Sequence, residues 1–145
     1  HPVFSLYRTY GAVAQRDYVN KVIASLLGEQ ATVQTTLPST ARVALNQQPS
    51  AHRNIFHLLF ANTIARGGSM NLSGGTVAAS GQSIEIIEEL LPLRNIDVSL
   101  RNQPFLKAVT LEPQGTAIPF TQDNGLVKFQ VEEFSCHQMI ALTEA

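Results

Sequence analysis

The sequence predicts a mainly β protein: an antiparallel, Greek-key-type β-sandwich preceded by two short amphipathic helices. The first observation is that apolar residues repeat with a helical period up to Gly28 and alternate with polar residues after it. The second is that the later segments are short and follow one another at intervals of roughly 8–14 residues, as sandwich strands do. The third is Asp123-Asn124-Gly125, which separates two alternating segments and is a strong hairpin signal.

The first 28 residues predict the two helices. In residues 2–10, apolar side chains fall at i, i+3, i+4 and i+7, and Gly11 is suited to end the helix. Residues 17–27 repeat this spacing, with Asp17 as the expected N-cap and Gly28 just after the last turn. The apolar face expected from both helices consists of Leu6, Tyr7, Tyr10, Val19, Ile23 and Leu26.

The strands are expected from residue 32 onward. Residues 32–37 are rich in β-branched side chains, residues 41–47 alternate, and residues 54–62 are apolar on both faces, as in a central strand. Residues 83–90 also predict a strand, although their Glu88-Glu89-Leu90-Leu91 end is compatible with a helical turn. The remaining expected strands are 96–100, 107–112, 117–120, 126–131 and 137–142. The Gly/Ser-rich stretch 66–82 predicts a mobile loop.

Composition and charge restrict the partners. The net charge is −1 and no Lys/Arg cluster occurs, so nucleic acid is not an expected partner. No apolar segment approaches the roughly 20 residues that a membrane-spanning helix needs, so no membrane partner is expected. Cys136 is the single cysteine and cannot form an internal disulfide, which favours a reducing compartment and predicts a cytoplasmic location.

Four carboxylates are candidates for glycoside hydrolysis: Glu85, Glu88, Glu89 and Asp97. That reaction requires two carboxyl groups held roughly 5–9.5 Å apart around the scissile bond. Nothing in the sequence sets such a separation. The adjacent Glu88 and Glu89 would point to opposite faces of a strand, so a solvated sheet edge is the preferred interpretation. We expect no catalytic residue in this chain.

The sequence also predicts no metal site and no cofactor site. The histidines are His1, His52, His57 and His137, and their spacing matches no common metal motif. Cys136 precedes His137 directly, and strand neighbours face away from each other, so a nucleophilic cysteine is not expected. Gly67-Gly68-Ser69 and Ser73-Gly74-Gly75 lack the GK[ST] ending of a phosphate-binding loop.

Several motifs resemble the C-terminal end of a family of bacterial glycoside hydrolases. These motifs are His1-Pro2-Val3-Phe4, Leu26-Leu27-Gly28-Glu29, Thr36-Leu37-Pro38-Ser39-Thr40-Ala41-Arg42-Val43, His57-Leu58-Leu59-Phe60-Ala61 and His137-Gln138-Met139-Ile140-Ala141-Leu142. The family is the β-galactosidase-like group, built from a TIM barrel, a flavodoxin-like trimerisation domain and a small C-terminal β domain. The resemblance implies that residues 1–29 complete the flavodoxin-like domain and that residues 30–145 form the C-terminal β-sandwich.

The resemblance implies a non-catalytic role, because the catalytic carboxylates of such enzymes lie on a barrel of about 250 residues that does not fit in this chain. We therefore expect a structural or interaction module that packs against other domains of a glycoside hydrolase and helps it to form a homo-oligomer. The alternative is a carbohydrate-binding module, although the chain has no Trp and its three tyrosines lie in the helical segment. A stand-alone enzyme that uses the carboxylates is the third hypothesis.

Overall fold

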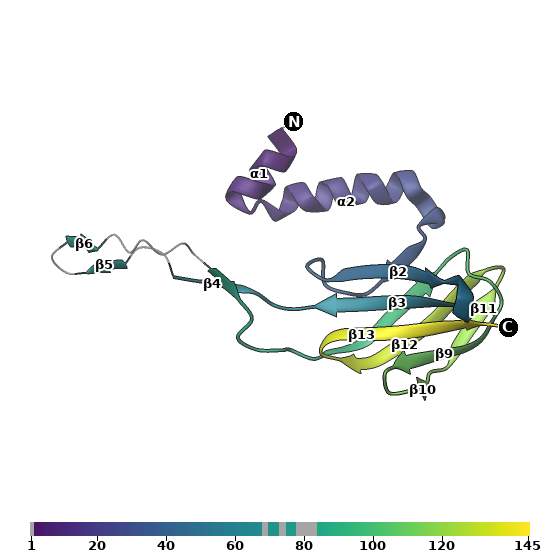
Figure 1. Ribbon diagram of the computed structural model, residues 1–145. Coiled ribbons are helices and arrows are strands. Elements are labelled where there is room, and N and C mark those ends of the chain that lie inside the picture. The colour runs from purple at the N-terminus through teal and green to yellow at the C-terminus, as the bar shows by residue number, and fades with distance from the viewer. Residues whose placement is uncertain (1, 68–69, 73–74, 78–83) are drawn as a thin grey trace.

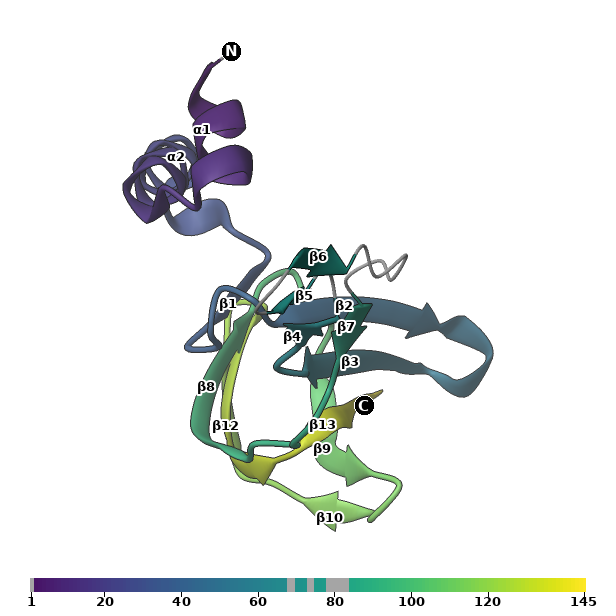
Figure 2. The same ribbon diagram turned by 90° about the vertical axis from the view of Figure 1, so that its left-hand side faces the viewer.

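The computed structural model describes residues 2–67, 70–72, 75–77 and 84–145. It begins with α1 (Pro2–Tyr10) and α2 (Val13–Leu27), followed by the short 3-10 helix η1 (Gly28–Gln30). The chain then forms two antiparallel sheets that face each other (Figure 1, Figure 2). The predicted β-sandwich preceded by two helices is confirmed. Among the described residues, no helix has the length and apolar character to cross a membrane.

The helices end where the sequence predicts, but α2 begins earlier. Gly11 adopts a φ of +62°, and its N–H donates to the Tyr7 carbonyl at 2.9 Å. Gly28 also has a positive φ, of +53°, as expected for the residue after a helix. The prediction that Asp17 caps α2 is wrong, because the helix already begins after Ala12. The intervening Val13-Ala14-Gln15-Arg16 contains strong helix formers, so the helix starts as soon as Gly11 has turned the chain.

The first sheet has four strands and the second has five. The order in the first sheet is β1 (Val33–Thr35), β8 (Leu93–Leu100), β12 (Leu126–Phe134) and β11 (Phe120–Asp123). The order in the second is β10 (Thr116–Ala117), β9 (Leu106–Glu112), β13 (Cys136–Glu144), β3 (Arg53–Phe60) and β2 (Arg42–Gln48). Spatial neighbours such as β3 and β13 are far apart in the sequence, as Greek-key connections require. A short 3-10 helix, η2 (Pro49–Ala51), joins β2 to β3.

The expected strand at 117–120 is divided. Its two ends belong to β10 and β11, which lie in different sheets. Pro119 stands between them, and it has no N–H to donate to a sheet ladder. The hairpin at Asp123-Asn124-Gly125 is confirmed, because Asp123 pairs with Leu126, and Asn124 and Gly125 have φ values of +48° and +76°. These values are typical of the type I′ turn that Asn-Gly favours.

A narrow antiparallel arm leaves the sandwich between β3 and β8 (Figure 1). Its strands are β4 (Ile64–Arg66) with β7 (Ile84–Ile86), and β5 (Met70–Leu72) with β6 (Gly75–Val77). The prediction of a loop over 66–82 is therefore wrong at β5 and β6, whose backbone groups bond each other. Residues 68–69, 73–74 and 78–83, which include much of the glycine-rich segments, lie outside the described residues. Residues 87–92 form neither a strand nor the alternative helical turn.

The core lies between the two sheets and takes side chains from both. The largest fully buried side chains are Phe56, Leu58, Leu100, Ile140, Leu142, Val98, Val109, Val127 and Val131. Phe56 and Leu58 point into the core from one face of β3, whereas the opposite face carries the buried Ile55, the half-buried His57 and the exposed Leu59. The prediction that this strand is central is confirmed, because it pairs with both β2 and β13.

Candidate functional site

The structure separates the candidate carboxylates into two groups. Asp97 lies in β8, on the outer face of the first sheet, and its Oδ1 accepts from the Gln130 amide at 2.8 Å. Glu85 lies in β7, and Glu88 and Glu89 follow it. The expectation that Glu88 and Glu89 point to opposite faces of a strand is wrong, because they lie outside any strand. Both line a depression of about 220 Å³ with Asn62, Ile64 and Leu91.

Glu88 is already occupied by an ion pair. Both of its carboxylate oxygens accept from the Arg66 guanidinium, at 2.8 and 3.0 Å. This hydrogen bonding raises the pKa of Arg66. A bidentate pair of this kind fixes the carboxylate against the arm, and it leaves Glu89 as the other carboxylate of the depression. Glu88 is thus part of a surface ion pair. This arrangement differs from two carboxyl groups positioned around a substrate.

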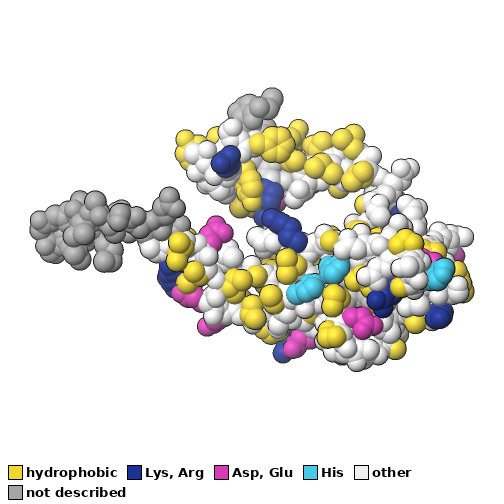
Figure 3. All heavy atoms as spheres, viewed as in Figure 1, with side chains coloured by type: hydrophobic (Ala, Val, Ile, Leu, Met, Phe, Trp, Pro, Cys, Tyr) yellow, Lys and Arg dark blue, Asp and Glu magenta, His cyan; other side chains and the backbone are white. Residues whose placement is uncertain are grey.

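The structure brings together two histidines that lie 80 residues apart in the sequence. His57 lies in β3 and His137 in β13, and Nδ1 of the first is 3.0 Å from Nε2 of the second. His57 is opposite Met139 and His137 is opposite Leu59, so the histidines are diagonal neighbours on one face. Figure 3 shows histidine side chains on this face of the sandwich. Only the register of strands 80 residues apart reveals the pair.

The two imidazole rings lie edge to edge. Their planes are 3° from parallel and their centroids are 5.3 Å apart. The centroid separation exceeds the 3.0 Å between the nitrogens by about the two ring radii, so the nitrogens face each other nearly in one plane. The rings border a depression of about 410 Å³ on the second sheet. Its other lining residues are Arg42, Val43, Ala44, Asn46 and Leu59.

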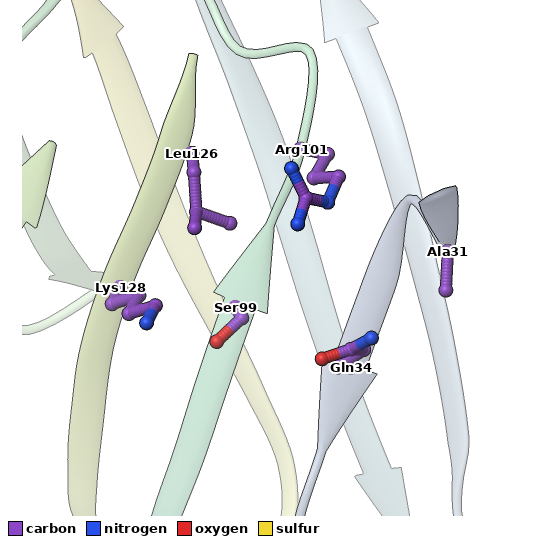
Figure 4. Close-up of a pocket in the computed structure, with 6 residues that line it drawn as sticks. All are labelled: Ala31, Gln34, Ser99, Arg101, Leu126 and Lys128. Atoms are coloured by element: carbon purple, nitrogen blue, oxygen red, sulfur yellow. The ribbon is translucent and has the colours of Figure 1, made fainter. Parts of the chain in front are cut away.

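A second, polar depression lies on the outer face of the first sheet. It has a volume of about 340 Å³ and is lined by Ala31, Gln34, Ser99, Arg101, Leu126 and Lys128. Gln34, Ser99 and Lys128 form one row across β1, β8 and β12, because Ser99 pairs with both of the others. Figure 4 shows these three side chains and the Arg101 guanidinium around a common space.

The depression in Figure 4 is rich in hydrogen-bonding groups, and its lining includes the cationic side chains of Arg101 and Lys128. Its lining supplies an amide, a hydroxyl, an ammonium and a guanidinium, and it includes no carboxylate. The carboxylate of Asp97, two residues before Ser99, is engaged with Gln130. Leu126 and Ala31 add two small apolar surfaces. This combination suits the hydroxyl groups of a sugar. No short-range sequence pattern indicates this depression, because its members are spread over about a hundred residues.

Most of the exposed large hydrophobic side chains among the described residues lie on the helix pair. None of the described side chains of α2 is buried, and Tyr10 and Leu26 are 76% and 81% exposed. Figure 3 shows hydrophobic side chains along both helices. Only part of the predicted apolar face is packed. Tyr7 and Val19 line one small depression between the helices. The outer members of the face remain uncovered.

One of three comparisons with known proteins supports this architecture. No protein-family model and no curated protein matches the chain. Among solved structures, the chain is similar to α-L-fucosidase isoenzyme 2 from Paenibacillus thiaminolyticus, with 35% sequence identity and a TM-score of 0.83. The match covers 99% of this chain and 20% of that protein. The predicted resemblance to part of a glycoside hydrolase is therefore confirmed, whereas the β-galactosidase-like type and the boundary near residue 29 stay predictions.

Proposed function

We propose that this chain is a non-catalytic structural module of a larger carbohydrate-active hydrolase, and that the helix pair attaches it to the rest of that enzyme. One observation carries the proposal. The sandwich buries its apolar side chains in a core, whereas α2 has no buried side chain. The similarity to one fifth of an α-L-fucosidase supports it. The parent would act on glycosides, and the β-galactosidase-like assignment with a flavodoxin-like domain ending near residue 29 belongs to the same proposal.

The exposed helix surface has an energetic reason to be covered. Phe4, Tyr10, Tyr18 and Leu26 are each more than 60% exposed. Burying one such side chain contributes about 1.5–3 kcal/mol, so covering several of them favours a docked state. Monomeric domains rarely leave a large contiguous apolar patch in water. A partner domain or a second copy of the chain would supply the missing surface.

Light scattering after size-exclusion chromatography tests the attachment surface on this chain. Without its parent, the chain should self-associate through the helices, and Tyr10→Ser with Leu26→Ser should return it to a monomer. Phe105→Ser is the matched control, because Phe105 is 75% exposed but lies on the sandwich. A wild-type monomer that binds no hydrophobic dye would contradict the attachment surface.

Hydrolysis assays test the non-catalytic part of the proposal. The chain should release no nitrophenol from nitrophenyl α-L-fucoside or nitrophenyl β-galactoside. If it did, and if Glu89→Gln or Asp97→Asn abolished the activity, the stand-alone enzyme hypothesis would replace the structural one. A contaminating hydrolase is identified by activity that both variants retain.

A carbohydrate-binding role is the second candidate function, and the polar depression in Figure 4 favours it. Amide resonances of β1, β8 and β12 should shift on titration with galactose-, fucose- or uronic-acid-containing oligosaccharides if the role is correct. Lys128→Ala should then weaken binding, while Lys107→Ala, which removes an exposed lysine from β9, should not. Unmoved resonances at millimolar sugar would leave the structural role as the function.

A further inference from the structure

The His57 and His137 imidazoles are spaced as two ligands of one metal ion. A ligating histidine nitrogen lies about 2.0–2.1 Å from a divalent transition metal. Two such nitrogens are about 2.9 Å apart at a right angle and about 3.3 Å apart at the tetrahedral angle. The observed 3.0 Å between Nδ1 of His57 and Nε2 of His137 is nearer to the right-angle value. Right-angle positions are typical of square-planar and tetragonal sites, which Cu²⁺ and Ni²⁺ prefer.

The sheet fixes the positions of both histidines. β3 lies between β2 and β13, and β13 lies between β9 and β3, so hydrogen bonds hold each strand on both sides. The buried neighbours Phe56, Leu58 and Ile140 anchor the same strands in the core. The backbone thus holds the two residues at neighbouring positions of one face before any ligand binds, and the hydrogen bond between the rings brings their nitrogens to 3.0 Å, which lowers the entropic cost of chelation.

The side chains need only a small adjustment to receive a cation. In the present arrangement, one of the facing nitrogens carries a proton and donates it to the other. A metal ion takes the place of this shared proton. The proton of the donor ring moves through solvent to the far nitrogen of the same ring, so both rings stay neutral and both facing nitrogens act as electron-pair donors. Rotation about χ2, which is a soft torsion, turns both lone pairs toward a point beside the line that joins them.

The surroundings leave room for water ligands. His137 is exposed and His57 is half-buried, and both rings border the 410 Å³ depression, with Ala44 and Leu59 beside them. Arg42 is the charged residue of this lining, and its guanidinium donates to the carbonyls of Thr40 and Ala41, at 3.3 and 3.1 Å. Among the described residues, no group of three or more His, Cys, Asp or Glu side chains could hold a metal. Water must therefore complete the coordination.

We infer that His57 and His137 form a surface site for one divalent transition-metal ion of tetragonal geometry, with two imidazole ligands and water. The site takes Cu²⁺ in preference to Ni²⁺ and Zn²⁺, following the general order of affinities. Mg²⁺ and Ca²⁺ do not bind at this site, because they require oxygen donors. The inference does not depend on the proposed function.

Calorimetric titration with CuSO₄, NiCl₂, ZnCl₂ and MgCl₂ tests the site. The protein carries His1→Ala and His52→Asn, so that the other two imidazoles cannot compete, and Asn suits the positive φ of position 52. One Cu²⁺ should bind per chain. His57→Gln and His137→Gln should each weaken Cu²⁺ binding by about tenfold or more, because either change removes the chelate. The double variant should be little weaker than either single one.

Two spectroscopic readouts separate chelation from general copper binding. Electron paramagnetic resonance of the 1:1 complex should show two equatorial nitrogen ligands, and Cu²⁺ should broaden the amide resonances of Leu59 and Met139 first. The inference is overturned if both His→Gln variants bind Cu²⁺ as tightly as their parent. It is also overturned if the broadening centres elsewhere in the chain. Circular dichroism of each variant verifies that the sandwich remains folded.

Discussion

The helix pair and the sandwich are built from similarly apolar segments, but only the sandwich buries them. In the sandwich, Leu100, Val127 and Ile140 are completely buried between the two sheets. In α2, the similar side chains of Val22, Ile23 and Leu26 are exposed. The difference lies in the partner surface, because each sheet finds the other within this chain, whereas the helices find only one another. Apolar periodicity therefore predicts which face is to be buried, but not whether its partner belongs to the same chain.

The test with the largest expected effect replaces one buried and one exposed side chain by alanine. Phe56→Ala should lower the free energy of unfolding by about 3–5 kcal/mol, because it opens a cavity between the sheets. Leu26→Ala should change it by less than about 0.5 kcal/mol, as expected for an exposed position. Urea denaturation measures both values. A comparable loss from Leu26→Ala would show that the helix face is packed in solution.

The next test concerns the buried polar pair of the sandwich. Asn54 Nδ2 donates to Gln103 Oε1 at 3.1 Å, and both residues are less than 9% exposed. Asn54→Ala should therefore cost about 1–3 kcal/mol, since the Gln103 carbonyl oxygen loses its buried donor. Thr36→Ala is a surface comparison, because its hydroxyl accepts from the exposed Asp97 N–H at 3.0 Å. Equal losses in urea denaturation would mean that water reaches Gln103.

Substitutions of two glycines compare the backbone of the sandwich with that of the helix pair. Gly125 in the β11–β12 turn and Gly28 after α2 both have positive φ, where an L-residue costs roughly 1–2 kcal/mol. Gly125→Ala should lower the urea midpoint of the sandwich because of its positive φ, since the new Cβ would make only an ordinary contact, at 3.5 Å, with the Gln103 backbone carbonyl oxygen. Gly28→Ala should reduce helical circular dichroism without moving that midpoint. A shift of the midpoint by Gly28→Ala would indicate that helices and sandwich unfold together.

Much of this architecture was predictable from local sequence, and the parts that were not depend on distant residues. The Asn124-Gly125 turn is encoded by its own φ requirements, and the central position of β3 by apolar side chains on both faces. The start of α2 was missed because Asp17 suggested a cap, although Ala14 and Gln15 extend the helix. The histidine pair depends on the β3–β13 register, and no short-range pattern reports a register of that kind.

The polar depression of the first sheet was missed for the same reason. Gln34, Ser99 and Lys128 are ordinary surface residues of three separate strands, and only pairing aligns them in one row. The prediction for the candidate carboxylates was wrong for the opposite reason. Glu88 and Glu89 are adjacent in sequence, but they follow β7 instead of extending it. Function on a sheet surface therefore requires the strand order, whereas the core requires only the alternation.

The smallest expected effect concerns a hydrogen bond between the helix pair and the sandwich. The Arg16 guanidinium donates to Ser39 Oγ at 2.8 Å and also pairs with Asp17, whose carboxylate raises the pKa of Arg16. Because this bond is exposed, Ser39→Ala should leave the urea midpoint unchanged within error. It should instead loosen the orientation of α2, which residual dipolar couplings measured for helix and sheet amides report directly. Arg16→Lys, which keeps the charge but loses the guanidinium, should loosen it to the same extent. If the couplings of both variants match the wild type, other contacts hold the helices in place, and the two regions are less independent than their burial indicates.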